Sequence, residues 1–530
     1  MEHAIYFNKR AGQNLGLARV LLIVILFAAV AQFASFGIIQ AHVISFYGAQ
    51  PEDITFAFQI AYVGIIATLP IMFRLIRFFN TRSYLLTAFL AGILLNIACL
   101  YVRDLVLFSI IRFFIGSVTC LVAGCLLIVL FSTLPESKRM LVGVSLFFSL
   151  ILTTGLIVGV PAAQIIQDAD WTGLYYALIS LQVIAILCCV SIFRTKVKRK
   201  SYPLYQVDWA GYVLIISGAA AAAFVMIYGP KRYWFADPLI RNTAIAAVLL
   251  LSSFLYRQTI IKRPLVDLRV FRSGKFIFGL LLMLLFFGVK DSINLVYGYA
   301  AGVLGWSTED VVNAGLFNIA GVVIATFIVI KVVLAKKKNL PKLLLAGFAV
   351  LCIYHWWVYR YLTPDLSFIQ LSIPVFLQGL GSGLLFVPIT ILCMASAPPS
   401  TGFTGIVVLT YTRFMATLNS IAGYYTLQLN YNQHFKTGFL SKLSPGTDQL
   451  VQRQELFNGI FAAKGFTAGE AAGISNLLIA KSTGIQGQLL TVRAVFLVAG
   501  LVTAAGLVML VVFAVVSKVK EKREGLKKAI

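Results

Sequence analysis

Fourteen long apolar segments, separated by mostly short polar connections, constrain the fold of this 530-residue chain more than any other feature. The chain is 60% hydrophobic and 12% charged, whereas a soluble protein has about 25% charged residues. A helix needs roughly 20 apolar residues to cross a bilayer, and lipid offers no partners for free backbone groups. We therefore predict an all-α polytopic membrane protein. The predicted spans are 17–44, 54–73, 84–102, 105–131, 140–166, 173–193, 208–228, 240–256, 276–303, 310–335, 342–359, 367–396, 402–430 and 490–517.

Basic residues alternate from one connection to the next. Lys and Arg gather in both tails and in the second, fourth, sixth, eighth and tenth connections, for example in 74–82, 194–200 and 257–275. The odd-numbered connections are poor in basic residues, except for Lys231 and Arg232 in the seventh. Basic connections stay in the cytoplasm, so both tails are predicted to be cytoplasmic, which requires an even number of spans. We predict a multi-pass protein of the cell (inner or plasma) membrane.

The composition argues against several classes of function. The net charge of +25 could indicate nucleic-acid binding, but most basic residues lie in the cytoplasmic connections, where they meet anionic lipid. The seven cysteines and four histidines show no metal-ligand spacing, and the chain has neither a catalytic Ser/His/Asp pattern nor a P-loop. We therefore predict no nucleic-acid partner, no metal, no cofactor, no enzymatic activity and no use of ATP.

Two strongly basic segments divide the spans into six, two and six. Residues 1–194 are predicted to form an N-terminal six-helix bundle. Residues 195–275 hold two linker spans between basic cytoplasmic segments, and residues 276–530 form a second six-helix bundle. Two such bundles indicate a repeat-built transporter whose substrate path lies between the halves.

The connection 431–489, predicted on the outer face, is much longer than the others. Its segment 455–481 is predicted to form one or two amphipathic helices. Long connections without structure are uncommon unless they are functional. Two interpretations stay open here: a variable cap, and a surface that docks a partner or acts in gating.

Short motifs along the chain point to a family. They are RFFIG at 112–116, LPESKR at 134–139, PLVDLRVFRSGKF at 264–276, VLGWS at 303–307, AGL at 314–316, GLGSGLLFVPIT at 379–390 and the segment 397–423. In this order and spacing they resemble the fourteen-helix drug:proton antiporter branch (EmrB/QacA type) of the major facilitator superfamily. The resemblance implies the major facilitator fold, two six-helix bundles plus two linker helices, and efflux driven by a proton gradient.

Three motifs of that branch are altered in this chain. Its cytoplasmic loop motif keeps basic residues at Arg77 and Arg82, but Ile76 stands where the family has the acid that helps to latch the closed state. The first span also lacks the aspartate that family members commonly have there.

The antiporter-type motif of the fifth helix is the third altered motif. Gly155 and Gly159 are kept, while the proline is displaced to Pro161. In the family this motif accompanies exporters. Glycines four residues apart also permit plain close packing of helices, with a bend near the proline, so both interpretations stay open.

Asp291 is the only acid well inside an apolar span. A charge at that depth costs several kcal/mol unless it is paired, hydrated or neutralised, so the carboxyl is a candidate proton carrier. Lys290 is adjacent, but neighbours on a continuous helix point about 100° apart, and we expect the two to face different partners. The alternative is a purely structural ion pair with Lys290, Arg112 or Arg413.

Two arginines inside spans are further proton-coupling candidates. Arg112 matches the family's RxxxG motif, and Gly116, one turn later, would let a neighbouring helix approach closely. Arg413 lies near the middle of its span, where it is predicted to face the cavity or to pair with Asp291. With Lys290, these residues would make a shared central cavity net positive, which favours neutral, zwitterionic or anionic substrates over lipophilic cations.

We conclude from the sequence that the chain is a secondary active transporter, a proton-coupled exporter of small amphipathic compounds that works by alternating access. Export of one specific metabolite, and a sensor or scaffold derived from a transporter, remain alternatives. A membrane-embedded transferase would need a cluster of acids or a His/Asp pair at one face, and the sequence shows none. In a host with two membranes, a periplasmic adaptor and an outer-membrane channel are possible partners at 431–489.

Overall fold

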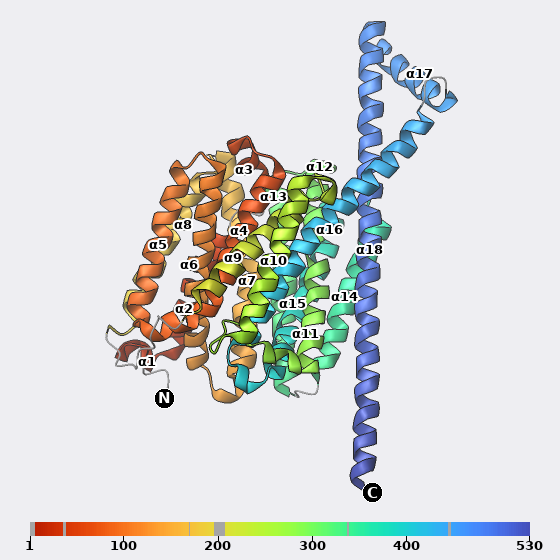
Figure 1. The fold of residues 1–530 in the computed structure, drawn as a ribbon. Helices are drawn as coiled ribbons and strands as arrows, with labels where there is room; N and C mark the ends of the chain where they lie inside the picture. Colours follow the sequence, from red (N-terminus) through yellow and green to blue (C-terminus); the bar gives the residue numbers. More distant parts are fainter. Residues whose placement is uncertain are drawn as a thin grey trace.

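The computed structural model describes residues 6–34, 39–168, 170–195, 207–335, 339–443 and 447–529. Within these ranges the chain is helical, and most helices run up and down side by side in one bundle (Figure 1). The helices of the first half are α1 (Lys9–Gln13), α2 (Leu15–Ala34), α3 (Gln40–Tyr47), α4 (Pro51–Phe78), α5 (Thr81–Tyr101), α6 (Leu105–Ser132), α7 (Glu136–Asp168) and α8 (Gly173–Ile192). They are followed by α9 (Trp209–Tyr228), α10 (Pro238–Ile260), α11 (Gly274–Lys290), α12 (Ile293–Gly302), α13 (Thr308–Ala335), α14 (Leu340–Tyr361), α15 (Phe368–Ser396), α16 (Thr404–Lys442), α17 (Asp448–Ala463) and α18 (Ala468–Ala529).

Thirteen segments of the described residues are long and apolar enough to cross a membrane, and they confirm the predicted all-α membrane fold. The remaining predicted span, 402–430, lies in α16, which carries Arg413 and many Thr, Tyr and Asn residues. These polar residues lower its hydropathy, yet α16 packs inside the bundle against α11, α18, α4 and α9. A helix shielded by protein on several sides does not need a uniformly apolar surface.

Two predicted spans are interrupted rather than continuous. The span 17–44 divides into α2 and α3, and residues 35–38 between them lie outside the described residues. The span 276–303 divides into α11 and α12, with Asp291 as the residue that caps α11. In the predicted division into two six-helix bundles, these are the first span of each bundle.

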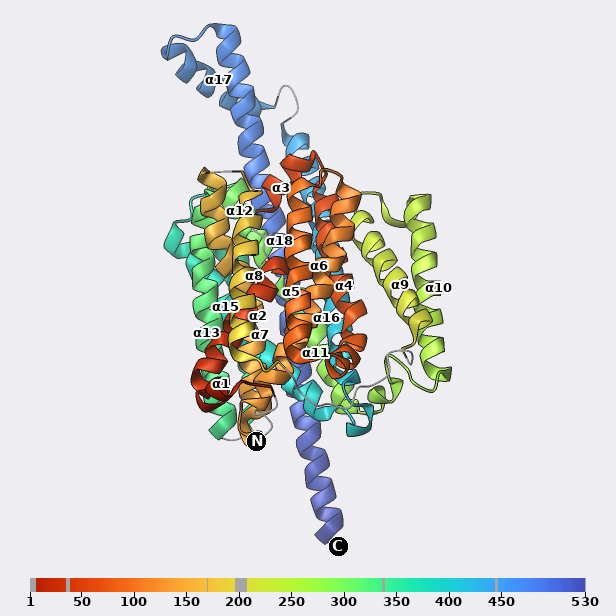
Figure 2. The same ribbon diagram turned by 90° about the vertical axis from the view of Figure 1, so that its left-hand side faces the viewer.

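The helix pair α9 and α10 lies at one side of the bundle (Figure 2). α9 packs against α4 of the first half and α16 of the second. At the start of α9, Asp208 accepts hydrogen bonds from the Gly211 amide (3.0 Å), Arg257 Nε (2.8 Å) and Gln258 Nε2 (3.2 Å). These bonds tie the start of α9 to the end of α10. Most of the basic connection 194–207, including Lys196 to Lys200, lies outside the described residues, as do 336–338.

The predicted outer connection 431–489 is almost entirely helical. α16 and α18 continue well beyond the bundle, and α17 lies between them as part of a projecting arm (Figure 1). Within the arm, Gln454 Nε2 donates to Asn476 Oδ1 (2.8 Å) and Ser475 Oγ donates to Asn458 Oδ1 (2.6 Å), so α17 is fastened to α18. We call the bundle end near α17 the arm side. The opposite end, with α1 and the C-terminal end of α18, is the tail side.

Candidate functional site

Two cavities lie between the halves of the bundle. The arm-side cavity has a volume of about 780 Å³ and is lined by polar and charged side chains, among them Glu52, Lys290, Asp291, Asn318 and Gln378. The tail-side cavity has a volume of about 320 Å³ and is mostly apolar. Both are lined by helices of the first half and of the second, which is the arrangement that an alternating-access transporter requires.

The ion pair of Lys290 and Asp291 lies in the wall of the arm-side cavity. Lys290 Nζ lies 3.1 Å from Asp291 Oδ1, and the two side chains are 24% and 16% exposed. The expectation that these neighbours face different partners is wrong. α11 ends at Lys290, so the 100° rotation of a continuous helix does not separate the two side chains. The second carboxylate oxygen, Asp291 Oδ2, is buried without a hydrogen-bond partner among the described residues.

Polar side chains from neighbouring helices bind the backbone carbonyls at the helix break. Gln378 Nε2 of α15 donates to the Lys290 carbonyl (2.9 Å), and Tyr424 Oη of α16 donates to the Val289 carbonyl (3.3 Å). Asn318 Nδ2 of α13 in turn donates to Gln378 Oε1 (2.5 Å). A break at membrane depth is tolerated only when protein groups take over the lost hydrogen bonds, as they do here.

Arg112 holds the other interrupted span. Its side chain is 1% exposed, and its two terminal nitrogens donate to the carbonyls of Gln32 and Phe33, both at 3.0 Å, at the end of α2. Contrary to the prediction of a shared cavity with Arg413, Arg112 lines neither cavity. These two bonds attach the guanidinium to the C-terminal part of the described α2. Arg112 thus binds backbone carbonyls of α2, as Gln378 binds a backbone carbonyl of α11.

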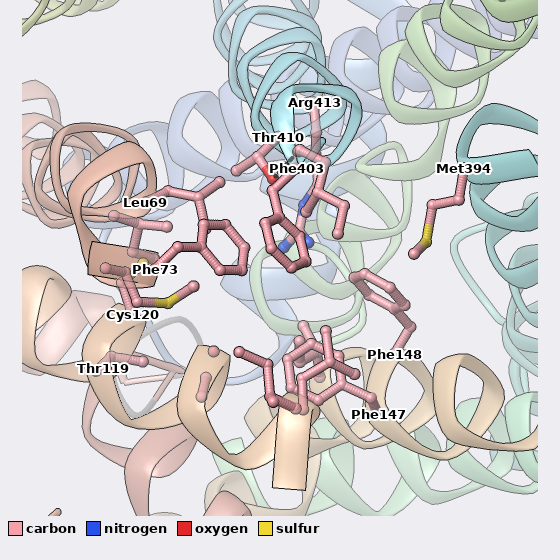
Figure 3. Close-up of a pocket in the computed structure, with 18 of the residues that line it drawn as sticks. Leu69, Phe73, Thr119, Cys120, Phe147, Phe148, Met394, Phe403, Thr410 and Arg413 are labelled. Carbon is pink, nitrogen blue, oxygen red and sulfur yellow. Dashed lines mark hydrogen bonds between the residues drawn. The ribbon is translucent and has the colours of Figure 1, made fainter. Parts of the chain in front are cut away.

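Arg413 lies in the tail-side cavity. Its guanidinium carbon is 5.4 Å from the ring centre of Tyr62, 5.1 Å from that of Phe287 and 5.5 Å from that of Phe386. Figure 3 shows the side chain reaching from α16 into the space bordered by aromatic rings. The predicted ion pair with Asp291 is not found among the described residues, where Asp291 pairs with Lys290. Within the described ranges, Arg413 Nε is buried without a hydrogen-bond partner.

An aromatic contact between α4 and the residue before α16 lies in the wall of the tail-side cavity. The rings of Phe73 in α4 and Phe403 just before α16 stack with centres 3.9 Å apart and planes 10° apart. The altered loop motif lies nearby on the chain. Arg77 is exposed at the end of α4, and Arg82 Nη1 donates to Thr195 Oγ1 (3.0 Å), a contact within the first half. The Phe73–Phe403 stack is thus an apolar contact between α4 and the residue that precedes α16.

The predicted glycine positions differ in how closely other atoms approach them: Gly116 is tightly surrounded, whereas Gly155 has open space beside it. A Cβ on Gly116 would come within 1.8 Å of the Ala61 carbonyl oxygen, so α6 and α4 cross in close contact there. Gly155 lines the arm-side cavity, with its nearest neighbour atom 3.7 Å from the place of a Cβ. Gly159 is buried, and α7 continues as one helix through Pro161.

Glu52 is a cavity residue that the sequence analysis did not single out. It is 6% exposed and accepts a hydrogen bond from Tyr425 Oη of α16 (2.9 Å). Lys231, in the turn between α9 and α10, lies 3.3 Å from the same carboxylate. The lysine that broke the alternation of basic connections is thus the ion-pair partner of a buried acid. The sequence signal that could have indicated this cavity residue is Glu52 itself, an acid beside an apolar span.

His355 is another residue that the sequence analysis did not single out, and it lies beside the helix break. It is fully buried, and its Nε2 lies 3.1 Å from Ser292 Oγ, next to Asp291 in the chain. Its position in a helix rich in tryptophan concealed its place beside the helix break. Among the described residues, no group of three or more His, Cys, Asp or Glu side chains is placed to hold a metal ion.

Comparisons with known proteins agree with this architecture. The multidrug export protein EmrB of Escherichia coli (strain K12) is 22% identical over 282 residues, which cover 51% of this chain and 52% of that protein. EmrB of Haemophilus influenzae is 25% identical over 334 residues, covering 61% of this chain and 62% of that protein. The fatty acid resistance protein FarB of Neisseria gonorrhoeae is 22% identical over 321 residues, covering 59% of each. The match thus spans little more than half the length of these relatives.

Among solved structures, the POT family transporter PepTSo aligns with 92% of this chain and 98% of its own, at 15% identity and a TM-score of 0.49. The sequence profile of the Major Facilitator Superfamily, a superfamily of transporters and not of enzymes, matches residues 21–423. This match runs from the first spanning helix into α16 and confirms the family expected from the short motifs. The chain belongs to the Major Facilitator Superfamily.

Proposed function

We propose that the protein is a secondary active transporter that exports small amphipathic compounds in exchange for protons. The halves would rock about the two cavities, so that the substrate path opens to the arm side and to the tail side in turn. The proton gradient would supply the energy, with no bound cofactor. The names of the relatives, which include multidrug export and fatty acid resistance, support this proposal.

The observation that carries the proposal is the half-paired carboxylate of Asp291. One oxygen pairs with Lys290 and the other has no partner in the described part of the chain, at the edge of a cavity large enough to hold water and substrate. Protonation of Asp291 would end its attraction to Lys290 and leave a lysine charge without compensation. A change of local charge at a helix break is a physical means of biasing one cavity conformation over the other.

The orientation we propose places the tail side in the cytoplasm and the arm outside, in the cell (inner or plasma) membrane. The basic segment 257–275 lies at the tail-side end of α10 and α11, which supports this orientation through the preference of basic connections for the cytoplasm. In a host with two membranes, the arm is where we propose that a periplasmic adaptor, and through it an outer-membrane channel, would dock.

Proton movement in liposomes tests the proposed function. Wild-type protein would be reconstituted with a pH-sensitive dye inside the vesicles, and amphipathic compounds would be screened for substrate-dependent proton flux. We expect flux in the wild type and its loss in Asp291→Asn. The control is Asp365→Asn, which changes an exposed carboxylate outside both cavities.

The outcomes discriminate between the alternatives. Undiminished flux in a folded Asp291→Asn variant would place the coupling site elsewhere. Absence of flux from the wild type with every compound would contradict the antiport proposal and favour a sensor or scaffold.

A further inference from the structure

We infer that the tail-side cavity binds amphipathic monoanions, with the carboxylate or sulfonate of the ligand on Arg413 and its alkyl or aryl body among the surrounding aromatic rings. This inference rests on the proposed export function and specifies its substrate class. It is argued from the lining of the cavity, from the charge of Arg413 and from the contrast with Arg112.

The lining of the cavity suits an apolar body. Phe73, Phe147, Phe148, Phe403 and Met394 surround the space, and they come from α4, α7, α15 and the turn before α16 (Figure 3). The volume of about 320 Å³ lies at the lower end of the range of small-molecule sites, which are about 300–1,000 Å³ and mostly apolar with few polar groups. Aromatic and thioether side chains adapt to different apolar shapes, so the walls favour a class of ligands rather than one compound.

The charge of the cavity is positive. Arg413 is the only charged residue among those that line it, and a guanidinium stays protonated in proteins. The two threonines of the lining offer no negative charge: Thr410 Oγ1 donates to the Ile406 carbonyl (3.0 Å) and Thr119 Oγ1 donates to the Ala29 carbonyl (3.1 Å). A cationic ligand would bring a second positive charge into an apolar space, whereas an anion would neutralise the first.

The contrast between two membrane arginines shows that Arg413 is not satisfied by the protein. Arg112 donates to two carbonyls at 3.0 Å. Arg413 has three aromatic faces around it, and no hydrogen bond from its terminal nitrogens is found among the described residues. Cation–π contacts stabilise a charge by about 0.5–2 kcal/mol but do not occupy the N–H donors. The donors of Arg413 are therefore available to the oxygens of a carboxylate or sulfonate, which a guanidinium binds in a bidentate manner.

Direct binding to the full-length protein in lipid nanodiscs tests the inference without requiring transport. Three radiolabelled probes share a ten-carbon chain: decanesulfonate, decanol and decyltrimethylammonium. Equilibrium binding would be measured against empty nanodiscs, which removes simple partition into lipid. We expect decanesulfonate to bind about tenfold to a hundredfold more tightly than decyltrimethylammonium, the range that a charge-assisted hydrogen bond supports.

Variants at position 413 separate the role of the charge from that of the fold. Arg413→Gln should lose the preference for decanesulfonate, while its affinity for decanol stays within about twofold of wild type and shows that the cavity is intact. Arg413→Lys should keep part of the preference. Arg103→Gln, at an arginine over the ring of Phe46 outside both cavities, should change nothing.

The inference is overturned if the three probes bind equally, if the cation binds most tightly, or if Arg413→Gln leaves the preference for decanesulfonate unchanged. None of these results affects the proton-flux test of Asp291, so antiport would stand without this substrate class. Conversely, Arg413-dependent binding in a protein that moves no protons would support the anion site and contradict the proposed antiport.

Discussion

Lys290 and Asp291 are adjacent in the chain and form an ion pair of 3.1 Å, because the helix that carries them ends between them. On a continuous helix these side chains would diverge. The break therefore creates the pair, and Gln378 stabilises the break by binding the Lys290 carbonyl. The Lys290–Asp291 pair, the helix break and the Gln378 amide lie together at the wall of the arm-side cavity.

The Lys290–Asp291 pair should show coupling in a double-mutant cycle. Each of Lys290→Met and Asp291→Asn should lower the melting temperature, because each leaves one partner without its counter-charge. The double variant should recover part of the loss, with a coupling free energy of about 0.5–3 kcal/mol for residues in contact. Thermal unfolding in detergent measures all four proteins. Strict additivity of the two losses would show that the pair does not form in the folded protein.

Gln378→Leu should destabilise the fold by about 1–3 kcal/mol, since it removes the Gln378 donor from the Lys290 carbonyl and one of the two acceptors of Asn318 Nδ2. The matched control is Gln428→Leu. Gln428 lines the same cavity, and no hydrogen bond of its side chain is found within the described ranges. Unfolding by heat would be followed by circular dichroism for both variants. Equal melting temperatures would contradict the role assigned to Gln378.

Phe403→Ala should open the tail-side cavity to water-soluble reagents, because it removes one ring of the stack with Phe73. Cys120 lines that cavity and is 5% exposed, so it serves as a reporter in a protein whose other cysteines are changed to serine. The rate of maleimide labelling of Cys120 should rise at least severalfold. Phe403→Tyr, which keeps the ring, should label at the wild-type rate, and a rise in both variants would count against the stack as a closure.

Gly116→Ala should be far more damaging than Gly155→Ala. A Cβ at position 116 would lie 1.8 Å from the Ala61 carbonyl oxygen, whereas at position 155 its nearest neighbour is 3.7 Å away. Forcing α6 and α4 apart should cost at least the 1–3 kcal/mol that is typical of an overpacked site. Melting temperature and the yield of monodisperse protein in size-exclusion chromatography would be compared. Similar values for the two variants would show that the helices do not cross closely at Gly116.

The sequence alone determined the class of the protein. Long apolar segments in lipid have no choice but to become helices, since every backbone group must find an internal partner. The boundaries of ten predicted spans, from 54–73 to 367–396 and excluding 276–303, agree with the helices to within about five residues. The order of the short motifs indicated the superfamily, which the comparison confirmed.

Only the tertiary structure decided how the charged residues are used. Hydropathy does not reveal this helix break, because residues 274–302 taken together are apolar enough for one span despite Lys290, Asp291 and Ser292. The carbonyls at the break are bound by Gln378 and Tyr424, which are distant in the chain. Arg112 and Arg413 also look alike in the sequence, because each is an arginine inside an apolar span. One meets the carbonyl end of α2, and the other meets aromatic faces and a cavity. The burial and the partners of a charge depend on long-range packing, and those decide its function.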